Sequence, residues 1–192
     1  AVICTGARAS PPPITGIDKV PCLTNETVFS LTELPRRMAV IGAGAVGCEL
    51  AQAFARFGTQ VTVYEQAGAI LPIEDAEAAE LVREAMARDG VRFVLKANIL
   101  QVLKHKDGLV IYHRANGAVE NLVVDEILLA AGRAPNVEGL ALETAGVLYD
   151  RSGVLVNDEL QTANPLVYAA GDVCSRFKFT HAADAMARLV IN

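Results

Sequence analysis

The sequence has no tryptophan, only three histidines and only four cysteines. The cysteines lie far apart, form no C-x-x-C pair and do not cluster with any histidine, which argues against a zinc site or a disulfide framework. We therefore expect no metal site, and we expect each thiol to be a small buried hydrophobic group. The four thiols belong to Cys4, Cys22, Cys48 and Cys174.

Long blocks of one charge and long apolar segments are absent too. Lys and Arg number 17 against 22 Asp and Glu, so the formal net charge is -5 and nucleic acid and anionic membranes are poor candidate partners. Apolar stretches such as residues 127–132 are far shorter than the roughly 20 residues of a membrane span, and no signal segment opens the chain. We expect a soluble, cytoplasmic protein.

The two ends of the sequence resemble the interior of a protein. The chain opens without Met on an apolar, strand-like run at residues 1–6 and stops within the helical pattern 181–192. We expect a fragment of a longer polypeptide with parts missing at both ends.

The first half of the chain predicts a doubly wound α/β fold. Three prolines at 11–13 force an extended connection, and Ser30 with Glu33 has the spacing of a capping box for a short helical turn that Pro35 ends. Alternating strand and helix patterns then predict βαβ units. These are a strand at 38–41, a helix at 45–57 ended by Gly58, a strand at 61–64, a helix at 75–88 and a third parallel strand at 91–95.

The second half predicts an antiparallel meander in place of the next helix. Short strands are separated by the turn signals Asp107-Gly108 and Asn116-Gly117, and a buried strand then ends in a break at residues 132–136. The fold class is therefore α/β, a Rossmann-like parallel sheet with a meander. The predicted elements are strands at 99–104, 109–113, 118–124 and 127–131, a short helix around 140–144, a strand at 166–170 and a terminal helix from His181.

A glycine fingerprint lies between the first predicted strand and helix. Gly42-Ala43-Gly44-Ala45-Val46-Gly47 matches G-x-G-x-x-G in the strand–turn–helix context that gives this pattern its meaning. The first glycine permits the tight turn, the second lets the backbone approach a pyrophosphate, and the third allows close helix packing. The N–H groups at the helix start bind the phosphates. The alternative is that the glycines serve packing alone.

Glu65 ends the second predicted strand, where a carboxylate can accept hydrogen bonds from ribose hydroxyls and repel a 2′-phosphate. Tyr64, Gln66 and Ala67 supply no arginine for such a phosphate, so NAD is favoured over NADP. The alternative is a solvated glutamate at a strand end.

Four motifs in order resemble the pyridine nucleotide-disulfide oxidoreductases, the flavoprotein family of dihydrolipoamide dehydrogenase, glutathione reductase and mercuric reductase. Residues 174–187 look most like the mercuric-reductase-like branch, and Cys4 departs from the alanine that the family usually has before Thr-Gly. The motifs are Thr5-Gly6-Ala7, Gly42 to Gly47 with Glu65, Gly132-Arg133-x-Pro135-Asn136, and Thr162 followed by Tyr168-Ala169-Ala170-Gly171-Asp172.

The resemblance implies an NAD-binding domain inserted in an FAD-binding domain: residues 1–34 and 135–192 would be FAD-domain segments, and 35–134 the NAD-binding domain. It implies that Thr5, Gly6 and Asp172 contact FAD, and that the Asp172 carboxylate holds a ribityl or ribose hydroxyl. The alternative is that Asp172 is a helix N-cap. Backbone N–H groups of Thr180 and His181 would lie near the flavin pyrimidine edge.

The resemblance also implies roles on the NAD side. Glu49 would lie near the nicotinamide, unless it is a first-turn glutamate that complements the helix dipole. Gly132 would let the cofactor approach closely, and Ala97 would line the adenosine side. Including the fingerprint residues Gly42, Gly44, Ala45, Val46 and Gly47, these are cofactor-binding residues, and none is predicted to be catalytic.

The implied function is the NAD(H)-binding portion of an FAD-dependent oxidoreductase, in which hydride passes from NADH through FAD to a redox-active cysteine pair and on to a disulfide or metal-ion acceptor. The cysteine pair would precede Ala1, and the catalytic histidine and the homodimer interface would follow Asn192, so these residues alone should be inactive. The alternative is a dinucleotide-binding sensor or scaffold without catalysis.

Overall fold

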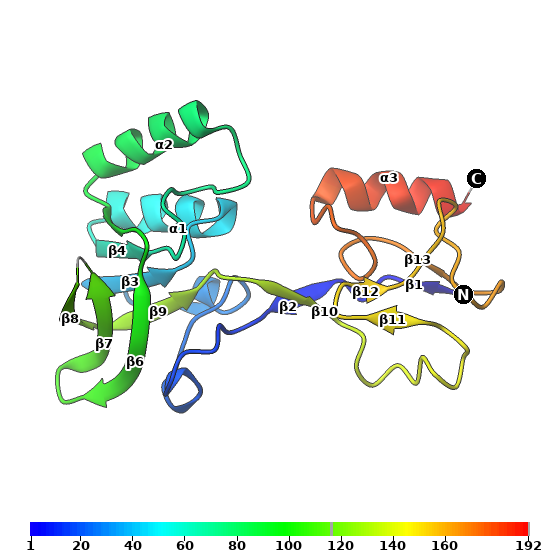
Figure 1. The fold of residues 1–192 in the computed structure, drawn as a ribbon, viewed down its shortest axis with the longest axis horizontal. Helices are drawn as coiled ribbons and strands as arrows, with labels where there is room; N and C mark the ends of the chain where they lie inside the picture. Colours follow the sequence, from blue (N-terminus) through cyan, green and yellow to red (C-terminus); the bar gives the residue numbers. More distant parts are fainter. Residues whose placement is uncertain (116, 192) are drawn as a thin grey trace. The chain divides into compact units, whose positions relative to one another are not determined.

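The computed structural model describes residues 1–115 and 117–191, and the chain divides into two compact units (Figure 1). The central unit is Ala9–Gly132, and the terminal unit combines Ala1–Arg8 with Arg133–Asn192. Residues 9–34 group with the central unit because their backbone joins it: Val102 N–H donates to Thr15 O at 2.9 Å and Leu23 N–H to Ile127 O at 2.7 Å. The boundary between the two compact units thus follows Arg8, whereas the resemblance placed the end of the first FAD-domain segment at residue 34.

A four-stranded parallel sheet forms the middle of the central unit. Its strand order is β5-β4-β3-β9, so the second and third strands in sequence lie on one side of the first and the fourth lies on the other. This is the order of half of a doubly wound dinucleotide-binding sheet. The strands are β3 (Arg37–Ile41), β4 (Gln60–Tyr64), β5 (Arg92–Val94) and β9 (Glu126–Leu129).

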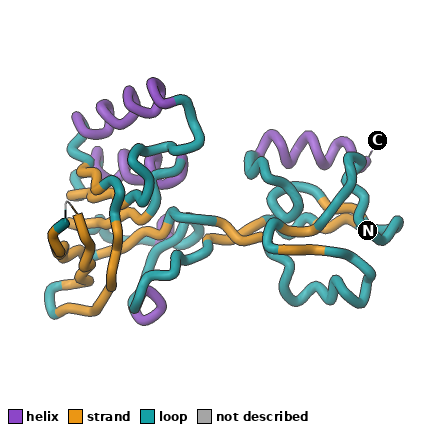
Figure 2. The backbone as a smooth tube through the Cα atoms, viewed as in Figure 1, coloured by secondary structure: helices purple, strands orange, loops and turns teal. Residues whose placement is uncertain are grey.

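Each face of this sheet has its own core. Along β3, Met38 and Val40 pack into one cluster with Ala51 and Met86, whereas Ala39 and Ile41 belong to a cluster on the opposite face. Helices α1 (Ala45–Arg56) and α2 (Ala76–Arg88) both cover the first face, as Figure 2 shows. The alternation follows from the two-residue period of a strand.

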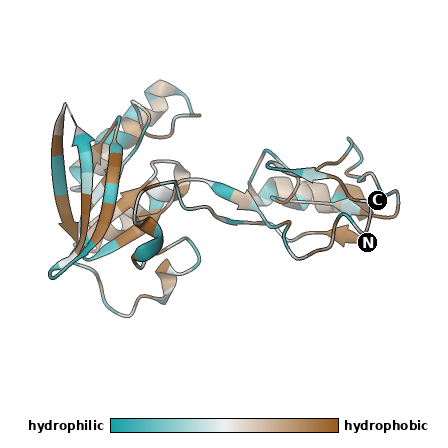
Figure 3. Cartoon of the chain, turned by 60° about the horizontal axis from the view of Figure 1, so that its bottom comes forward, coloured by the Kyte–Doolittle hydropathy of each residue, from teal (hydrophilic) through white to brown (hydrophobic). Residues whose placement is uncertain are grey.

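The antiparallel meander β6-β7-β8 contributes to the core on the second face. Buried residues of the meander, including Val102 and Ile111, pack there with Ala39 and Ile127. Hydrophobic and hydrophilic residues both occur along its strands (Figure 3), and the consecutive apolar residues Leu109, Val110 and Ile111 of β7 are all buried. The strands are β6 (Asn98–His105), β7 (Gly108–Ala115) and β8 (Ala118–Val124).

The terminal unit is held by pairs of strands from the two ends of the chain. Its core gathers Leu142, Val154, Ala169 and Val173. Strand β1 (Val2–Ile3) pairs in parallel with β13 (Tyr168–Ala169), and β2 (Ala7–Ala9) pairs with β10 (Arg133–Pro135). Strands β11 (Tyr149–Asp150) and β12 (Gly153–Val154) form an antiparallel hairpin, and α3 spans Thr180–Ile191.

The α/β prediction, with its βαβ units and its meander, is confirmed. None of the helices built from the described residues combines the length and the apolarity that crossing a bilayer demands. The predicted turn residue Asn116 lies outside the described residues.

Several local predictions are wrong. The helix expected around 140–144 is a set of turns, because Ala141 adopts a positive φ of 50° that interrupts helical geometry. The helical turn expected after Ser30 lies earlier, as the 3-10 helix η2 (Val28–Ser30), because Thr24 accepts the N–H groups that start it. A second 3-10 helix, η1 (Ile17–Lys19), was not predicted.

Other local predictions need smaller corrections. The expected break at 132–136 contains strand β10, and the loop before the last strand contains the hairpin β11–β12. The last strand covers only Tyr168–Ala169 rather than 166–170. The thiols are not all buried: Cys48 is buried, Cys22 and Cys174 are half-buried, and Cys4 is exposed.

Candidate functional site

The turn between β3 and α1 needs two of its glycines for packing. Gly42 has φ of 106°, and a Cβ there would lie 2.8 Å from the backbone of Ala130. A Cβ on Gly47 would lie 2.1 Å from Gly42 O, so this glycine lets the first turn of α1 rest against the strand end. Packing alone therefore explains Gly42 and Gly47.

Gly44 has no such packing role. It is the N-cap residue of α1 with an extended backbone (φ −72°, ψ −178°), and a Cβ there would meet nothing within 4 Å. Any residue could adopt this backbone conformation, so the backbone does not require glycine here. The space in front of Gly44 is open, and a side chain at this position would fill it. That space is the observation that fits a group approaching the backbone closely.

The start of α1 presents free N–H groups at this space. Cys48 N–H makes the first helical bond, to Gly44 O at 2.9 Å, and Gly44 has no side chain to cap the helix. Among the described residues, no acceptor takes the N–H groups of Ala45, Val46 and Gly47. With the positive end of the helix dipole, they form a site suited to an anion such as a pyrophosphate.

Glu65 points its carboxylate at the backbone of the same turn. Its Oε2 accepts from Ala43 N–H at 2.8 Å, and its Oε1 accepts from Ala67 N–H at 2.9 Å. The side chain is half-buried rather than fully solvated. Each oxygen keeps a lone pair that can accept a hydroxyl. Glu65 thus connects the end of β4 to the glycine turn.

A cleft of about 320 Å³ brings three predicted residues together in the central unit. Gly42, Glu65 and Ala97 all line it, and Ala97 is 5% exposed. The sequence analysis did not predict that Pro12 and Pro13 also line the cleft, because it treated the prolines at 11–13 only as a linker. The remaining lining residues are Pro12, Pro13, Ile14, Ile41, Tyr64, Gln66, Asn98, Ile99 and Ala131.

Glu49 and Gly132 do not line this cleft, although Gly132 directly follows the lining residue Ala131. Glu49 is exposed and borders a separate hollow of about 210 Å³ with Ala45, Gln52 and Met86. It follows the first turn of α1, which holds no acidic residue, so the dipole interpretation of Glu49 is wrong. Gly132 is exposed, and its carbonyl accepts from Ser10 N–H at 3.3 Å.

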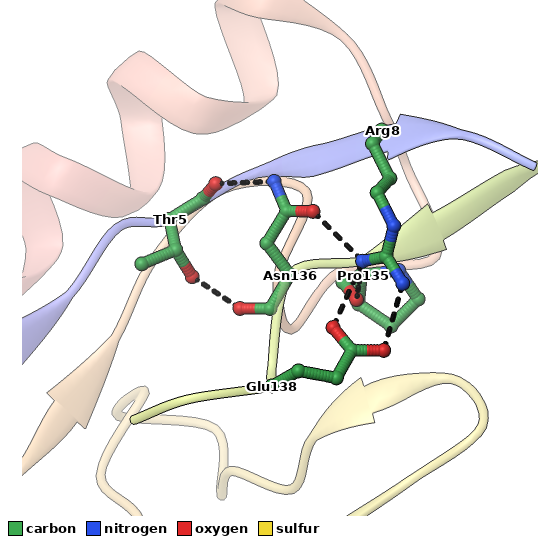
Figure 4. A network of polar contacts seen from close by, with 5 residues as sticks. All are labelled: Thr5, Arg8, Pro135, Asn136 and Glu138. Carbon is green, nitrogen blue, oxygen red and sulfur yellow. Dashed lines mark hydrogen bonds and ion pairs between the residues drawn. The ribbon is translucent and has the colours of Figure 1, made fainter.

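In the terminal unit, the first and third predicted motifs bind each other (Figure 4). Thr5 Oγ1 donates to Asn136 O at 2.7 Å, and Asn136 Nδ2 donates to Thr5 O at 2.8 Å. Arg8 donates to Pro135 O and Asn136 Oδ1 and pairs through two bonds with Glu138. The Arg8 guanidinium lowers the pKa of the Glu138 carboxyl. These polar groups therefore fasten the strands β2 and β10.

Asp172 follows β13 and is paired already with an arginine. Its Oδ2 lies 3.1 Å from Arg133 Nη2, and the same nitrogen donates to Ala7 O at 2.8 Å. Asp172 Oδ1 has no hydrogen-bond partner among the described residues, so one carboxylate oxygen can still accept a hydroxyl. Asp172 does not cap α3, which begins only at Thr180, so the N-cap interpretation is wrong.

Thr180 and His181 are the first two residues of α3, and both are exposed. The imidazole of His181 stacks on the ring of Phe179, with centroids 5.3 Å apart and planes 7° apart. The N–H groups of Thr180 and His181 therefore lie in the first turn of a helix, as the resemblance implied.

Burial raises the pKa of three thiols. Burial raises the pKa of Cys48 and of Cys22 to about 11, and burial also raises that of Cys174. Over residues 1–115 and 117–191, no group of three or more His, Cys, Asp and Glu side chains could hold a metal ion.

The fold and the glycine turn together define an α/β domain of the dinucleotide-binding type. A family model described as pyridine nucleotide-disulphide oxidoreductase matches residues 1–187, and the chain belongs to this family. The resemblance inferred from the four motifs is thereby confirmed.

Relatives support the same family. Mercuric reductase from Staphylococcus aureus is 36% identical over 192 residues, which are 100% of this chain and 35% of that protein. Dihydrolipoyl dehydrogenase 3 from Pseudomonas aeruginosa is 38% identical over 99% of this chain and 41% of its own length. The chain spans well under half the length of these two relatives.

A solved structure is also similar. The Cu(II) complex of the HOCl-induced flavoprotein disulfide reductase RclA from Escherichia coli superposes with a TM-score of 0.90 at 32% identity, covering 98% of this chain and 43% of that one.

Proposed function

We propose that this chain is the NAD(H)-binding portion of an FAD-dependent oxidoreductase. In the whole protein, hydride would pass from NADH through FAD to a redox disulfide, and on to a disulfide or a metal ion. Gly44 carries the proposal: its open space and the free N–H groups beside it fit a pyrophosphate, whereas packing explains Gly42 and Gly47.

The chain's own residues would bind and orient the coenzyme. The N–H groups of Ala45, Val46 and Gly47 would hold the pyrophosphate, and Glu65 would accept the adenosine ribose hydroxyls through its remaining lone pairs. The cleft beside Glu65 and Ala97 would take the adenosine, and Glu49 and Gly132 would lie on the nicotinamide side of the turn.

The terminal unit would supply part of an FAD site. Asp172 Oδ1 would accept a ribityl or ribose hydroxyl while Arg133 fixes the carboxylate, and Thr5 and Gly6 would lie along the same cofactor. The N–H groups of Thr180 and His181 would face the flavin. FAD, when bound, supplies two-electron chemistry between the nicotinamide and a disulfide. These features favour an enzyme over a sensor or scaffold that binds only NAD.

Calorimetric titration of the chain with NADH tests the coenzyme site. The matched variants are Glu65→Gln and Glu120→Gln, the second removing an exposed carboxylate outside the cleft. Glu65→Gln replaces an acceptor oxygen that faces Ala43 N–H or Ala67 N–H with a donor, so we expect roughly tenfold weaker NADH binding from the lost charge-assisted bonds.

Glu120→Gln should bind NADH as the unmodified chain does. An unmodified chain that stays folded by circular dichroism and takes up no NADH would refute the proposed function.

A further inference from the structure

The backbone beyond β5 is fastened to the turn that follows β4. Lys96 N–H donates to Ala67 O at 2.9 Å, and Ala97 N–H donates to Glu65 O at 2.8 Å. These two bonds place Lys96 beside residues 65–68, at the carboxyl edge of the parallel sheet. Ligands of open α/β sheets bind outside this edge.

The side chain of Lys96 lies over that turn. Its backbone is left-handed, with φ of 52°, and its Cε lies 3.3 Å from the position that a Cβ on Gly68 would occupy. The residue is exposed, so the alkyl chain runs along Gly68 while the ammonium stays in water. Among the described residues, no carboxylate comes within ion-pair distance of Lys96.

The nearby carboxylate is directed toward the protein backbone. Both oxygens of Glu65 accept backbone N–H groups, from Ala43 and Ala67, and these donors offset part of its negative charge. Glu65 lines the cleft, and Lys96 directly precedes Ala97, which also lines it. The turn beside the cleft therefore carries one carboxylate held against the backbone and, over Gly68, one ammonium without an ion-pair partner among the described residues. Glu65 alone predicts repulsion of an added phosphate, and Lys96 opposes that repulsion.

We propose that Lys96 is a specificity-determining residue that supplies the counter-charge for a phosphate on the adenosine ribose. The cleft then accepts the 2′-phosphorylated coenzyme as well as the unphosphorylated one. A lysine ammonium is a compact point charge that binds phosphate without the planar geometry of arginine. The inference rests on the proposed coenzyme site and names a second form of its ligand.

Paired titrations with NADP⁺ and NAD⁺ test this role. Lys96→Met keeps the alkyl chain over Gly68 and removes the charge, and Lys96→Arg keeps the charge. Lys104→Met is the matched control, because Lys104 is an exposed lysine near the end of β6 whose backbone is not bonded to residues 65–68. We expect Lys96→Met to weaken NADP⁺ binding about tenfold and NAD⁺ binding less than about twofold. Lys96→Arg and Lys104→Met should change neither.

A second measurement on the unmodified chain needs no variant to fold. Added salt should weaken NADP⁺ binding more steeply than NAD⁺ binding, because the extra phosphate pairs with an exposed charge. Equal NADP⁺ binding by Lys96→Met and by the unmodified chain, or NAD⁺ binding without NADP⁺ binding, would overturn the role of Lys96. Failure of both nucleotides to bind the folded chain would instead overturn the proposed coenzyme site.

Discussion

Replacing Gly44 with alanine should separate coenzyme binding from folding. The new Cβ meets no protein atom within 4 Å, and the backbone at φ −72° and ψ −178° suits any residue. The free energy of unfolding should change by less than about 1 kcal/mol, because reduced freedom of the unfolded chain offsets a poorer N-cap. The methyl group would occupy the space in front of the helix N–H groups, where we place the pyrophosphate.

The expected loss of NADH affinity follows from the displaced hydrogen bonds. One bond to a charged group contributes about 1.5–3 kcal/mol, so losing one weakens binding about tenfold to a hundredfold. Calorimetric titration would measure the dissociation constant, and thermal unfolding followed by circular dichroism would measure stability on the same sample.

Gly47→Ala is the matched comparison, three residues along the same turn. Its Cβ would lie 2.1 Å from Gly42 O, so the helix must move, at a cost of about 1–3 kcal/mol. For a chain of this size the melting temperature should fall by about 2–4 °C per kcal/mol. NADH affinity unchanged in Gly44→Ala would refute the pyrophosphate assignment, and unchanged stability in Gly47→Ala would refute the packing argument.

Two further predictions follow from pKa values. Burial lowers the pKa of His113 below its ordinary 6.5, while Glu120, 3.9 Å from Nε2, opposes this effect. Tyr64 OH lies 3.4 Å from Nδ1 of the same ring. The neutral His113 side chain therefore stabilises the fold above pH 6.5, and this contribution is lost as the pH falls through its folded pKa. The urea midpoint of the unmodified chain should thus fall more between pH 7.5 and pH 5.5 than that of His113→Gln, and parallel curves would contradict this role. Burial raises the pKa of Cys48 to about 11, so iodoacetamide at pH 8 should modify the exposed Cys4 well before the buried Cys48. Peptide mass spectrometry would measure the order of modification. Rapid modification of Cys48 in the folded chain would contradict its burial.

The parallel sheet was predictable because its signals are local. An apolar strand, a glycine turn and an amphipathic helix ended by Gly58 all lie within residues 37–64, and each agrees with the others. The meander was predictable for the same reason, from short strands and turn residues. The glycine turn and the Glu65 carboxylate were both assigned to the coenzyme, and the structure brings them together because both lie at the carboxyl ends of adjacent parallel strands.

The remaining features depend on residues far apart in sequence. Nothing near Ser10 or Arg133 predicts strands β2 and β10, since each of these short segments becomes a strand only by pairing with the other. The wall of the cleft at Pro12 and Pro13 likewise needs the parallel bridge between Thr15 and Gln101. The left-handed backbone of Lys96 has no signal in its own sequence, because tertiary hydrogen bonds at the strand ends impose it.

The contacts among the predicted motifs change what those motifs imply. Thr5 and Asn136 were placed in separate motifs, yet their side chains bind each other's backbone, and Arg133 holds Asp172. A residue can therefore belong to a motif because it fastens two distant segments, and only the groups that keep an open acceptor or donor remain for a ligand. By that criterion Asp172 Oδ1 and the N–H groups after Gly44 are the strongest binding candidates, whereas the hydroxyl proton and the carbonyl of Thr5 are already bonded to Asn136.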